Sequence, residues 1–254
     1  MVTRPGVKIN IGLDVLRKRP DGYHDIETFF VPYHGYADTL EIVQAPKFSI
    51  DIDFGGAAPW DPEKDLTVRA YKLLRADFDI PPVAIRLQKG SPVGAGLGGG
   101  SADAAFALRM ISEMFDLFLP DEMLSIYASE LGSDCAFFVY DRPMFAAGRG
   151  ELLEDFPLPA LDDYEVRVKV PSGICVSTKD AYSSLVPAVP ELRLKDALRL
   201  PVEQWRDCVK NDFETTVFVK YPLLASVKEE LYREGAVYAA MSGSGSALFG
   251  LFKK

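Results

Sequence analysis

The stretch that decides the fold is Pro92-Val93-Gly94-Ala95-Gly96-Leu97-Gly98-Gly99-Gly100-Ser101-Ala102-Asp103-Ala104-Ala105. It lies between a strand-like run, residues 83–87, and an apolar segment with helical spacing, residues 102–115. Glycine loses more backbone entropy on folding than other residues, so this density of glycines indicates that backbone amides approach a ligand closely. Ser101 is predicted to cap the helix, whose unpaired N–H groups and positive dipole end would face the same ligand. The pattern predicts a phosphate-binding loop, with a flexible turn as the alternative.

The context of the glycines excludes three common phosphate loops. A Walker A loop needs a lysine after the last glycine, and none follows here. Gly94, Gly96 and Gly99 satisfy GxGxxG, but a dinucleotide site also needs an acidic residue at the end of a second strand about 20 residues later. Glu113 and Asp116 instead end a predicted helix. The VAIK, HRD and DFG motifs of protein kinases are also missing.

The segments around this loop predict an α+β fold. In the first half, strands are predicted at residues 7–13, 39–43, 48–52 and 83–87, and helices at 66–74, 102–115 and 122–131. In the second half, strands are predicted at 165–170, 236–241 and 247–252, and helices at 178–185, 202–208 and 223–234. The turn Gly148-Arg149-Gly150 and the proline-interrupted stretch after it predict two domains, 1–150 and 151–254.

Composition and charge limit the partners that we expect. The 254 residues are 48% hydrophobic, enough for one large domain or two modest ones. Acidic residues outnumber basic ones, 37 to 28, and no Lys/Arg block could follow a phosphate backbone, so nucleic acid is not an expected partner. The sequence gives no indication of oligomeric state.

The sequence predicts a cytoplasmic protein. Residues 1–10 have no apolar signal-peptide core, and no run of 18 apolar residues occurs, so we expect neither export nor a membrane partner. The three cysteines, Cys135, Cys175 and Cys208, are widely spaced and form no CxxC pair. They are interpreted as reduced and structural.

The glycine segment resembles the phosphate loop of the GHMP kinases, in the longer form GLGGGSxDAA. Two other stretches support this resemblance. Lys8-Ile9-Asn10-Ile11-Gly12-Leu13 and Arg19-Pro20-Asp21-Gly22-Tyr23-His24-Asp25-Ile26-Glu27-Thr28 resemble the signature KxNLxL…RxDGYHxIxT of the branch that phosphorylates cytidylylated polyols. Met241-Ser242-Gly243-Ser244-Gly245-Ser246-Ala247-Leu248-Phe249 resembles the third motif, a glycine loop beside the nucleotide phosphates. The motifs occur in the family's order, and DGYH distinguishes this branch from mevalonate and homoserine kinases.

The resemblance implies a two-domain GHMP kinase fold. Its N-terminal domain would be like the second domain of ribosomal protein S5, and its C-terminal domain would be ferredoxin-like. It also implies ATP and Mg²⁺ as cofactors, with the metal ligands unknown. The implied nucleotide-binding residues are Asp65, Lys89, Pro92, Val93, Gly94, Ala95, Gly96, Leu97, Gly98, Gly99, Gly100, Ser101 and Ala102. Asp65 and Ala102 stand where the family usually has Asn and Ser.

Asp134 and Lys8 are the candidate catalytic residues. Asp134 lies between a Gly-Ser turn and an apolar run, where a carboxylate would be partly desolvated unless a cation paired with it. Taken alone, the residue types favour a helix cap for Asp134 and a solvated strand residue for Lys8. The segment resembles the family's GxDxxFF, whose aspartate is the catalytic acid/base. By the same resemblance, Lys8 would orient that carboxylate and stabilise charge on the transferred phosphoryl group.

The resemblance also implies a substrate site. Its residues are Asn10, Tyr23, His24, Phe30, Thr178 and Tyr182. Stacked aromatic rings suit a pyrimidine face, although a single aromatic residue is more often part of a core. The implied activity is transfer of the ATP γ-phosphate to a hydroxyl of a cytidylylated polyol in non-mevalonate isoprenoid precursor biosynthesis. The alternatives are another GHMP small-molecule kinase and a catalytically silent, nucleotide-sensing relative.

Overall fold

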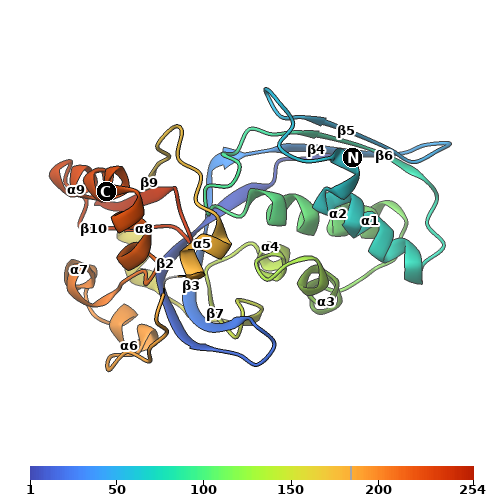
Figure 1. Ribbon diagram of the computed structural model, residues 1–254. Coiled ribbons are helices and arrows are strands. Elements are labelled where there is room, and N and C mark those ends of the chain that lie inside the picture. Colours follow the sequence, from blue (N-terminus) through green and yellow to red (C-terminus); the bar gives the residue numbers. More distant parts are fainter. Residues whose placement is uncertain (184) are drawn as a thin grey trace. The chain divides into compact units, whose positions relative to one another are not determined.

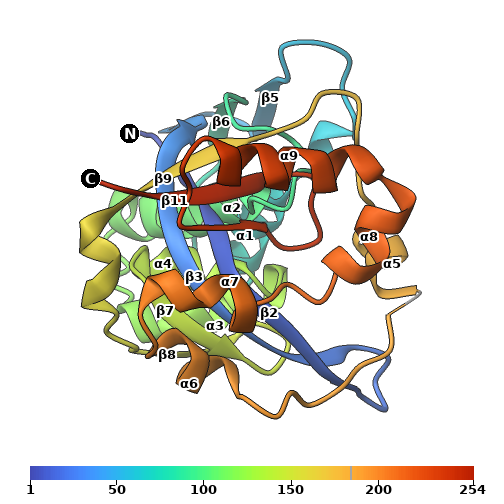
Figure 2. The same cartoon turned by 90° about the vertical axis from the view of Figure 1, so that its left-hand side faces the viewer.

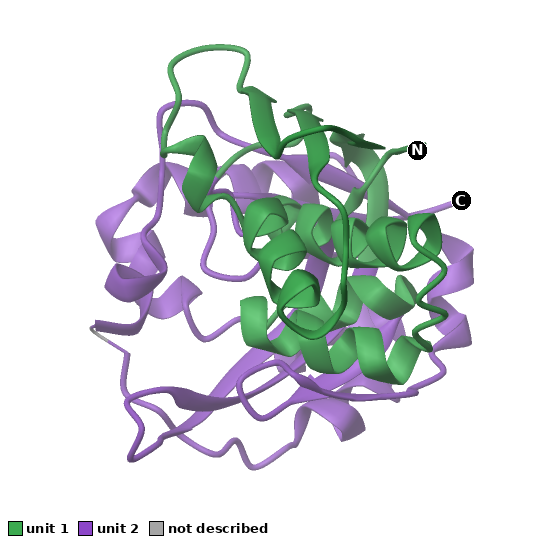
Figure 3. Ribbon diagram, turned by 90° about the vertical axis from the view of Figure 1, so that its right-hand side faces the viewer, with its two compact units in different colours: residues 1–7, 32–93, 98–142 green, residues 8–31, 94–97, 143–254 purple. Residues whose placement is uncertain are grey.

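The computed structural model describes residues 1–183 and 185–254 (Figure 1, and Figure 2 from another side). It divides into two compact units (Figure 3): unit 1 is residues 1–7, 32–93 and 98–142, and unit 2 is residues 8–31, 94–97 and 143–254. The units alternate along the chain, so residues 8–31 and 94–97 pack with the second half of the sequence. The predicted domain boundary near residue 150 stays a prediction.

Unit 1 contains a four-stranded sheet. Its order is β1 (Val2–Thr3), β4 (Thr39–Gln44), β6 (Val83–Gln88) and β5 (Ser49–Asp53). β4 runs antiparallel to β6, and β5 runs parallel to it, so Ile85 lies between Ile42 and Ile50. The alternation of buried and exposed residues in β6 is the period-two pattern of a strand with one face in the core. All three longer strands lie where the sequence predicts them.

The helices of unit 1 lie on one side of this sheet (Figure 1). They are η1 (Pro62–Lys64), α1 (Leu66–Asp77), α2 (Gly99–Met114), α3 (Asp121–Leu131) and α4 (Cys135–Tyr140). α2 packs against α1 and β4. Its buried face is rich in alanine: Ala102, Ala104, Ala105 and Ala107 are all at most 2% exposed. Small side chains let a helix approach its neighbours closely, which fixes where the N-terminus of α2 lies.

The predicted helix cap at Ser101 is wrong. α2 begins at Gly99, its N-cap is Gly98, and Ser101 lies inside the first turn. Gly98 has φ +76°, a left-handed conformation that glycine adopts without steric cost. The chain can therefore turn directly into the helix three residues before the predicted start at residue 102.

Two sheets are formed largely or wholly by unit 2. The first has the order β2 (Gly6–Lys18), β3 (His24–Ala37), β7 (Met144–Ala147) and β8 (Leu152–Glu154). In its centre, Phe29 of β3 lies opposite Phe145 of β7, and both rings are buried. β3, β7 and β8 were not predicted from the sequence. β3 lacks a regular alternation of apolar and polar residues, because it contains several charged residues, the apolar run Phe29-Phe30-Val31 and a proline.

The second sheet of unit 2 is antiparallel, with the order β10 (Tyr238–Met241), β11 (Leu248–Lys253) and β9 (Tyr164–Lys169). α9 (Pro222–Arg233) packs against β10 and β11 (Figure 2). Leu231 of α9 belongs to the same buried cluster as Met241 and Leu248. The other elements are η2 (Pro159–Asp163), α5 (Thr178–Ser183), α6 (Leu194–Leu198), η3 (Val202–Gln204), α7 (Trp205–Cys208) and α8 (Glu214–Lys220).

The helix α5 and the lack of a membrane-spanning helix among the described residues bear on two expectations from the sequence. Of the helix predicted at 178–185, residues 178–183 are helical and residue 184 lies outside the described residues. Within the described part of the chain, no helix has both the length and the apolar character needed to cross a bilayer.

Unit 2 contains a group of carboxylates around Asp14 of β2, which is buried with 8% of its surface exposed. The pKa of Asp14 is raised to about 7. Burial is the largest cause, repulsion from Asp212 and Glu27 adds to it, and the positive charge of Arg193 opposes it. Arg193 forms an ion pair with Glu27, and Asp212 accepts a hydrogen bond from the Val15 amide at 2.7 Å. Since an unfolded aspartate ionises near pH 4, the folded chain holds this proton more tightly than the unfolded chain.

The Asp14→Asn variant should therefore change the pH dependence of stability. A carboxyl group whose pKa is raised by folding contributes to the free energy of unfolding. For Asp14 this contribution is fully present below about pH 4 and is lost as the pH rises through about 7. Asparagine does not ionise and so loses no stability over this range. The Tm of the variant minus the Tm of wild type should therefore be at least ~2 °C higher at about pH 8 than at about pH 5. Thermal unfolding at both pH values measures this difference. Asp51 is exposed, and Asp51→Asn is the control. If the Tm of Asp14→Asn differed from that of wild type by the same amount at both pH values, the raised pKa of Asp14 would be contradicted.

Candidate active site

Parts of all three sequence motifs meet around Lys8 in unit 2. The Lys8 ammonium group donates to Asn10 Oδ1 at 2.6 Å and to the Gly96 carbonyl at 2.9 Å. The Ser242 hydroxyl donates to the same carbonyl at 3.1 Å and accepts from the Asn10 amide at 3.3 Å. A Cβ atom on Gly243 would lie 3.4 Å from the Lys8 nitrogen. The N-terminal motif therefore joins the glycine loop to the third motif.

Lys8 is a buried residue, with only 3% of its surface exposed. Its ammonium group lies 5.3 Å from the centre of the Phe30 ring, a cation–π distance. The alternative of a solvated strand residue is therefore wrong. Asn10 is held in turn by Thr28, whose hydroxyl accepts from its amide nitrogen at 3.0 Å and donates to the Gly12 carbonyl at 2.6 Å. Phe30 is 1% exposed, and its contact with substrate stays a prediction.

The glycine loop needs glycine for two physical reasons. Gly94, Gly96 and Gly98 all have φ between +68° and +77°, which is unfavourable for other residues. In addition, a Cβ atom on Gly96 would lie 2.3 Å from the Ser242 carbonyl oxygen. The third motif supports the loop further, because the Ala247 amide donates to the Ala95 carbonyl at 3.0 Å.

Asn211 holds the third motif in place, although no sequence motif predicts this role. Its side-chain amide donates to the carbonyls of Met241 and Gly243 at 2.7 and 2.8 Å, and its oxygen accepts from the Phe213 amide at 3.0 Å. All three hydrogen bonds are buried. The residue has no neighbouring motif, so only the hydrophobic context around it could have suggested a buried amide.

In unit 1, the N-terminus of α2 can receive an anion. Its N-cap is a glycine, so no side chain of that residue occupies the first-turn N–H groups. The amides of Gly99, Gly100 and Ser101 begin the helix, and the helix dipole adds a partial positive charge there. Backbone amides and a positive dipole end of this kind suit an anion such as a phosphate group.

Lys89, predicted to bind the nucleotide, has its ammonium group buried between two carboxylates. It forms ion pairs with Asp38 and, at 2.6 Å, with Asp103 of α2, and its side chain is 3% exposed. Burial lowers the pKa of Lys89, but the two carboxylates outweigh that effect and raise the pKa. Asp38 also accepts hydrogen bonds from the amides of Gly90 and Ser91, each at 2.7 Å. The cluster connects the end of β6 to the first turns of α2, and a contact of Lys89 with nucleotide stays a prediction.

Asp65 performs a local structural task at the start of α1. One carboxylate oxygen accepts from the amide and hydroxyl of Thr67, at 2.9 and 2.7 Å, and caps the helix. The other oxygen accepts from the Trp60 indole nitrogen at 3.1 Å. The predicted contact of Asp65 with nucleotide stays a prediction, as do those of Pro92 and Val93.

Asp134 is half-buried and directly precedes α4. Its backbone is already helical, and within the described residues its side chain forms no capping hydrogen bond with α4. Asp134 thus occupies the N-cap position that the alternative predicts, but its side chain does not cap the helix. The neighbouring thiol of Cys135 is not a nucleophile at neutral pH, because burial raises its pKa to about 12 despite a hydrogen bond with Ser101.

Two predicted substrate residues of unit 2 stack on each other. The rings of His24 and Tyr182 are 4.5 Å apart with an angle of 16° between their planes, and Phe213 meets Tyr182 edge to face at 4.7 Å. Burial and the charge of Lys18 lower the pKa of His24, so the imidazole is neutral at pH 7. A neutral imidazole can both donate and accept a hydrogen bond. Thr178 lies 3.3 Å from the Ser244 hydroxyl, so α5 contacts the third motif.

Comparisons with known proteins identify the family of this chain. The family model described as GHMP kinases N terminal domain matches residues 65–142, and the one described as GHMP kinases C terminal matches residues 186–254. A relative from Bacteroides fragilis is 48% identical over 99% of this chain and 92% of its own length. The chain belongs to the GHMP kinase family. That relative, like one from Cytophaga hutchinsonii that is 41% identical over 99% of this chain and 92% of its own length, is named 4-diphosphocytidyl-2-C-methyl-D-erythritol kinase.

Solved structures confirm the predicted α+β fold of the GHMP kinases. A crystal structure of 4-(cytidine 5′-diphospho)-2C-methyl-D-erythritol kinase matches with a TM-score of 0.81 and 32% identity, covering 99% of this chain and 90% of the other. A homoserine kinase from Cytophaga hutchinsonii matches with a TM-score of 0.70 at 20% identity, covering 98% and 86%, which shows a shared fold.

Gly96→Ala should weaken ATP binding more than tenfold in a folded protein. The new methyl group would displace the Ser242 carbonyl, and the left-handed backbone adds roughly 1–2 kcal/mol of strain. Gly173→Ala is a matched control, because Gly173 has φ +76° and nothing within 4 Å of its Cβ position. Calorimetric titration with ATP, together with Tm, compares the two variants. Wild-type ATP affinity in folded Gly96→Ala would contradict the proposed phosphate loop.

Proposed function

We propose that this chain transfers the γ-phosphate of ATP to the 2-hydroxyl of 4-diphosphocytidyl-2-C-methyl-D-erythritol, a step in non-mevalonate isoprenoid precursor biosynthesis. The observation that carries the proposal is the hydrogen-bonded arrangement of Lys8, Asn10, Gly96 and Ser242, which joins all three motifs. The high similarity to relatives named for this activity, over nearly the whole chain, supports the choice of substrate.

Phosphoryl transfer requires mainly positioning and charge stabilisation. The N-terminus of α2 and the glycine loop would hold the ATP phosphates through backbone amides. Mg²⁺ would be carried largely by phosphate oxygens and would neutralise their charge. The described residues contain no cluster of three or more His, Cys, Asp or Glu side chains suited to a metal. The Lys8 ammonium group would stabilise negative charge on the transferred group.

Asp134 is the proposed proton acceptor. The substrate hydroxyl oxygen would form a bond to the γ-phosphorus while the bond from that phosphorus to the ADP oxygen breaks, and the hydroxyl proton would pass to the Asp134 carboxylate. In a loose transition state the carboxylate would act as much by orienting the hydroxyl as by removing its proton. Its half-buried place before α4 suits either contribution.

The substrate's pyrimidine is proposed to bind at Tyr23, His24 and Tyr182. The 4.5 Å between the His24 and Tyr182 ring centres is a direct stacking distance. A base cannot enter between rings at this separation. A pyrimidine that stacks on this face of Tyr182 therefore replaces the His24 ring, and the displaced neutral imidazole can hydrogen-bond the edge of the base.

Asp134→Asn should lower kcat by roughly 10²–10⁴-fold, the usual contribution of general acid–base catalysis. Asparagine preserves the shape of the side chain but cannot accept the proton, so ATP binding and the Tm should stay close to those of wild type. Steady-state kinetics of ADP release measure the effect. A decrease of less than tenfold would exclude the assigned role.

Tyr182→Ala should raise the KM for the cytidylylated substrate by roughly 5- to 150-fold, because one stacking contact is worth about 1–3 kcal/mol. The KM for ATP should change little. Tyr182→Phe retains the aromatic face and should retain most of the affinity, so it separates stacking from loss of structure.

Substrate identity is tested by kcat/KM for the cytidylylated substrate and for bare methylerythritol. Wild type should strongly prefer the cytidylylated compound, and Tyr182→Ala should lose much of that preference. Equal values for the two compounds in wild type would disprove the proposed substrate and leave the family assignment unchanged.

A further inference from the structure

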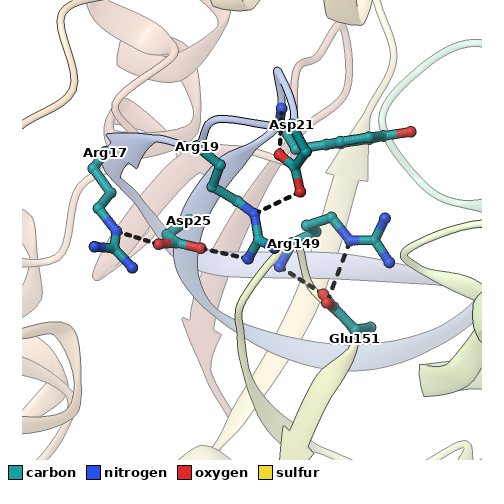
Figure 4. Close-up of polar contacts among 7 residues, drawn as sticks. Arg17, Arg19, Asp21, Asp25, Arg149 and Glu151 are labelled. Atoms are coloured by element: carbon teal, nitrogen blue, oxygen red, sulfur yellow. Dashed lines mark hydrogen bonds and ion pairs between the residues drawn. The ribbon is translucent and has the colours of Figure 1, made fainter.

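The turn that carries Tyr23 is held by a network of ion pairs in unit 2. Arg19 donates to Asp21 at 3.0 Å and to Asp25 at 2.9 Å, and Asp25 also pairs with Arg17 (Figure 4). Asp21 accepts from the Tyr23 amide at 3.0 Å. These contacts fix the backbone at Tyr23, yet the residue remains 54% exposed. An exposed aromatic ring on a fixed backbone is available for stacking.

Arg149 lies against this ring. Its guanidinium carbon is 5.0 Å from the centre of the Tyr23 ring, within cation–π range. Glu151 holds Arg149 at two points: one carboxylate oxygen accepts from the Arg149 backbone amide at 2.6 Å, and the other accepts from its side chain at 3.3 Å (Figure 4). Both residues belong to the connection between β7 and β8. The guanidinium group is thus fixed from a different part of the chain than the tyrosine.

The turn around Arg149 is itself attached to β3. The Gly148 carbonyl accepts from the Ile26 amide at 2.7 Å, and Gly148 and Gly150 have φ of +69° and +115°. Since β3 begins at His24, one turn of backbone holds both the arginine and the start of the strand that follows Tyr23. The position of Arg149 relative to Tyr23 is therefore set by backbone hydrogen bonds as well as by the ring contact.

We propose that Arg149 is a positioning residue for substrate binding: its guanidinium group covers one face of the Tyr23 ring and leaves the opposite face as the surface on which the pyrimidine stacks. This inference rests on the proposed function. An exposed tyrosine must lose side-chain freedom when it stacks on a ligand, and a ring already held by a cation has lost part of it. Arg149 therefore acts through Tyr23, without itself contacting the base.

A rival role for Arg149 is direct binding of the substrate diphosphate, since a guanidinium group suits phosphate oxygens well. The contact with Tyr23 favours the positioning role, because Arg149 already stacks on the ring and pairs with Glu151. The two roles differ in one respect. If Arg149 acts through the ring, its effect depends on the presence of Tyr23, whereas a direct phosphate contact does not.

The test is a double-mutant cycle of Arg149→Ala and Tyr23→Ala, with calorimetric Kd values for the cytidylylated substrate, CMP and ATP. Arg149→Ala should weaken binding of both cytidine compounds by about 3- to 10-fold and leave ATP binding unchanged. In the Tyr23→Ala background, Arg149→Ala should cause no further loss. Arg149→Lys retains the charge without the planar group and should recover part of the affinity.

Arg167→Ala is the matched control. Arg167 also pairs with a glutamate two residues away, Glu165, and lies 4.2 Å from the centre of an aromatic ring, Phe252, so its removal deletes the same kind of contact elsewhere in unit 2. It should leave all three Kd values unchanged. Unchanged cytidine binding in Arg149→Ala would overturn the inference, and so would an equal loss in the presence and absence of Tyr23.

The inference and the proposed function can fail separately. If wild type prefers the cytidylylated substrate over the bare polyol but Arg149→Ala binds it normally, only the inference is wrong. If wild type shows no such preference, the proposed substrate is wrong, and the inference is overturned with it.

Discussion

The buried ammonium group of Lys8 is the interaction on which the candidate site depends. A desolvated cation is costly unless acceptors surround it, and Lys8 finds them in the Asn10 side chain and the Gly96 carbonyl. One acceptor comes from β2 and the other from the glycine loop. The Ser242 hydroxyl of the third motif donates to the same Gly96 carbonyl. A hydrogen bond to a charged group is worth about 1.5–3 kcal/mol, so these contacts hold the segments in one geometry.

Unit 1 uses the same physical device, a buried lysine held by acceptors from separate segments of the chain. There, one buried lysine is shared by two aspartates, and Asp38 also binds the backbone after β6. The Oδ1 atom of Asp103 has no hydrogen-bond partner among the described residues, so this cluster is less completely satisfied than the one around Lys8. Both clusters fix backbone beside glycines, where side chains are absent and cannot do so.

The sequence was informative where backbone geometry limits the choice of residue. The glycine loop, the strands with period-two burial and most helices lie close to their predicted places, because φ angles and periodicity leave a local pattern. The cap at Ser101 was wrong because Gly98 starts the helix earlier through a left-handed turn that the pattern did not distinguish. β3 was missed because its neighbours, rather than its own alternation, make it a strand.

The site was predictable to a smaller extent. Motif resemblance found Lys8 and Asn10, and the structure places them together. It could not find Asn211 or Asp38, since the contacts of both join residues distant in sequence. Lys89 illustrates the limit most clearly. The resemblance implies a contact with nucleotide, which stays a prediction, but it gives no sign of the two observed partners, Asp38 and Asp103, which lie 51 and 14 residues away in sequence.

The alternation of the two units along the chain has a consequence for synthesis on the ribosome. Every residue of unit 1 lies within the first 142, so this unit can fold while the rest of the chain is still being made. Unit 2 cannot. The middle strand of its three-stranded sheet is β11, residues 248–253, which lies more than 100 residues after the end of unit 1. Residues 8–31 belong to the other sheet of unit 2 and must wait, already synthesised, until their partner strands β7 and β8, residues 144–147 and 152–154, have followed unit 1.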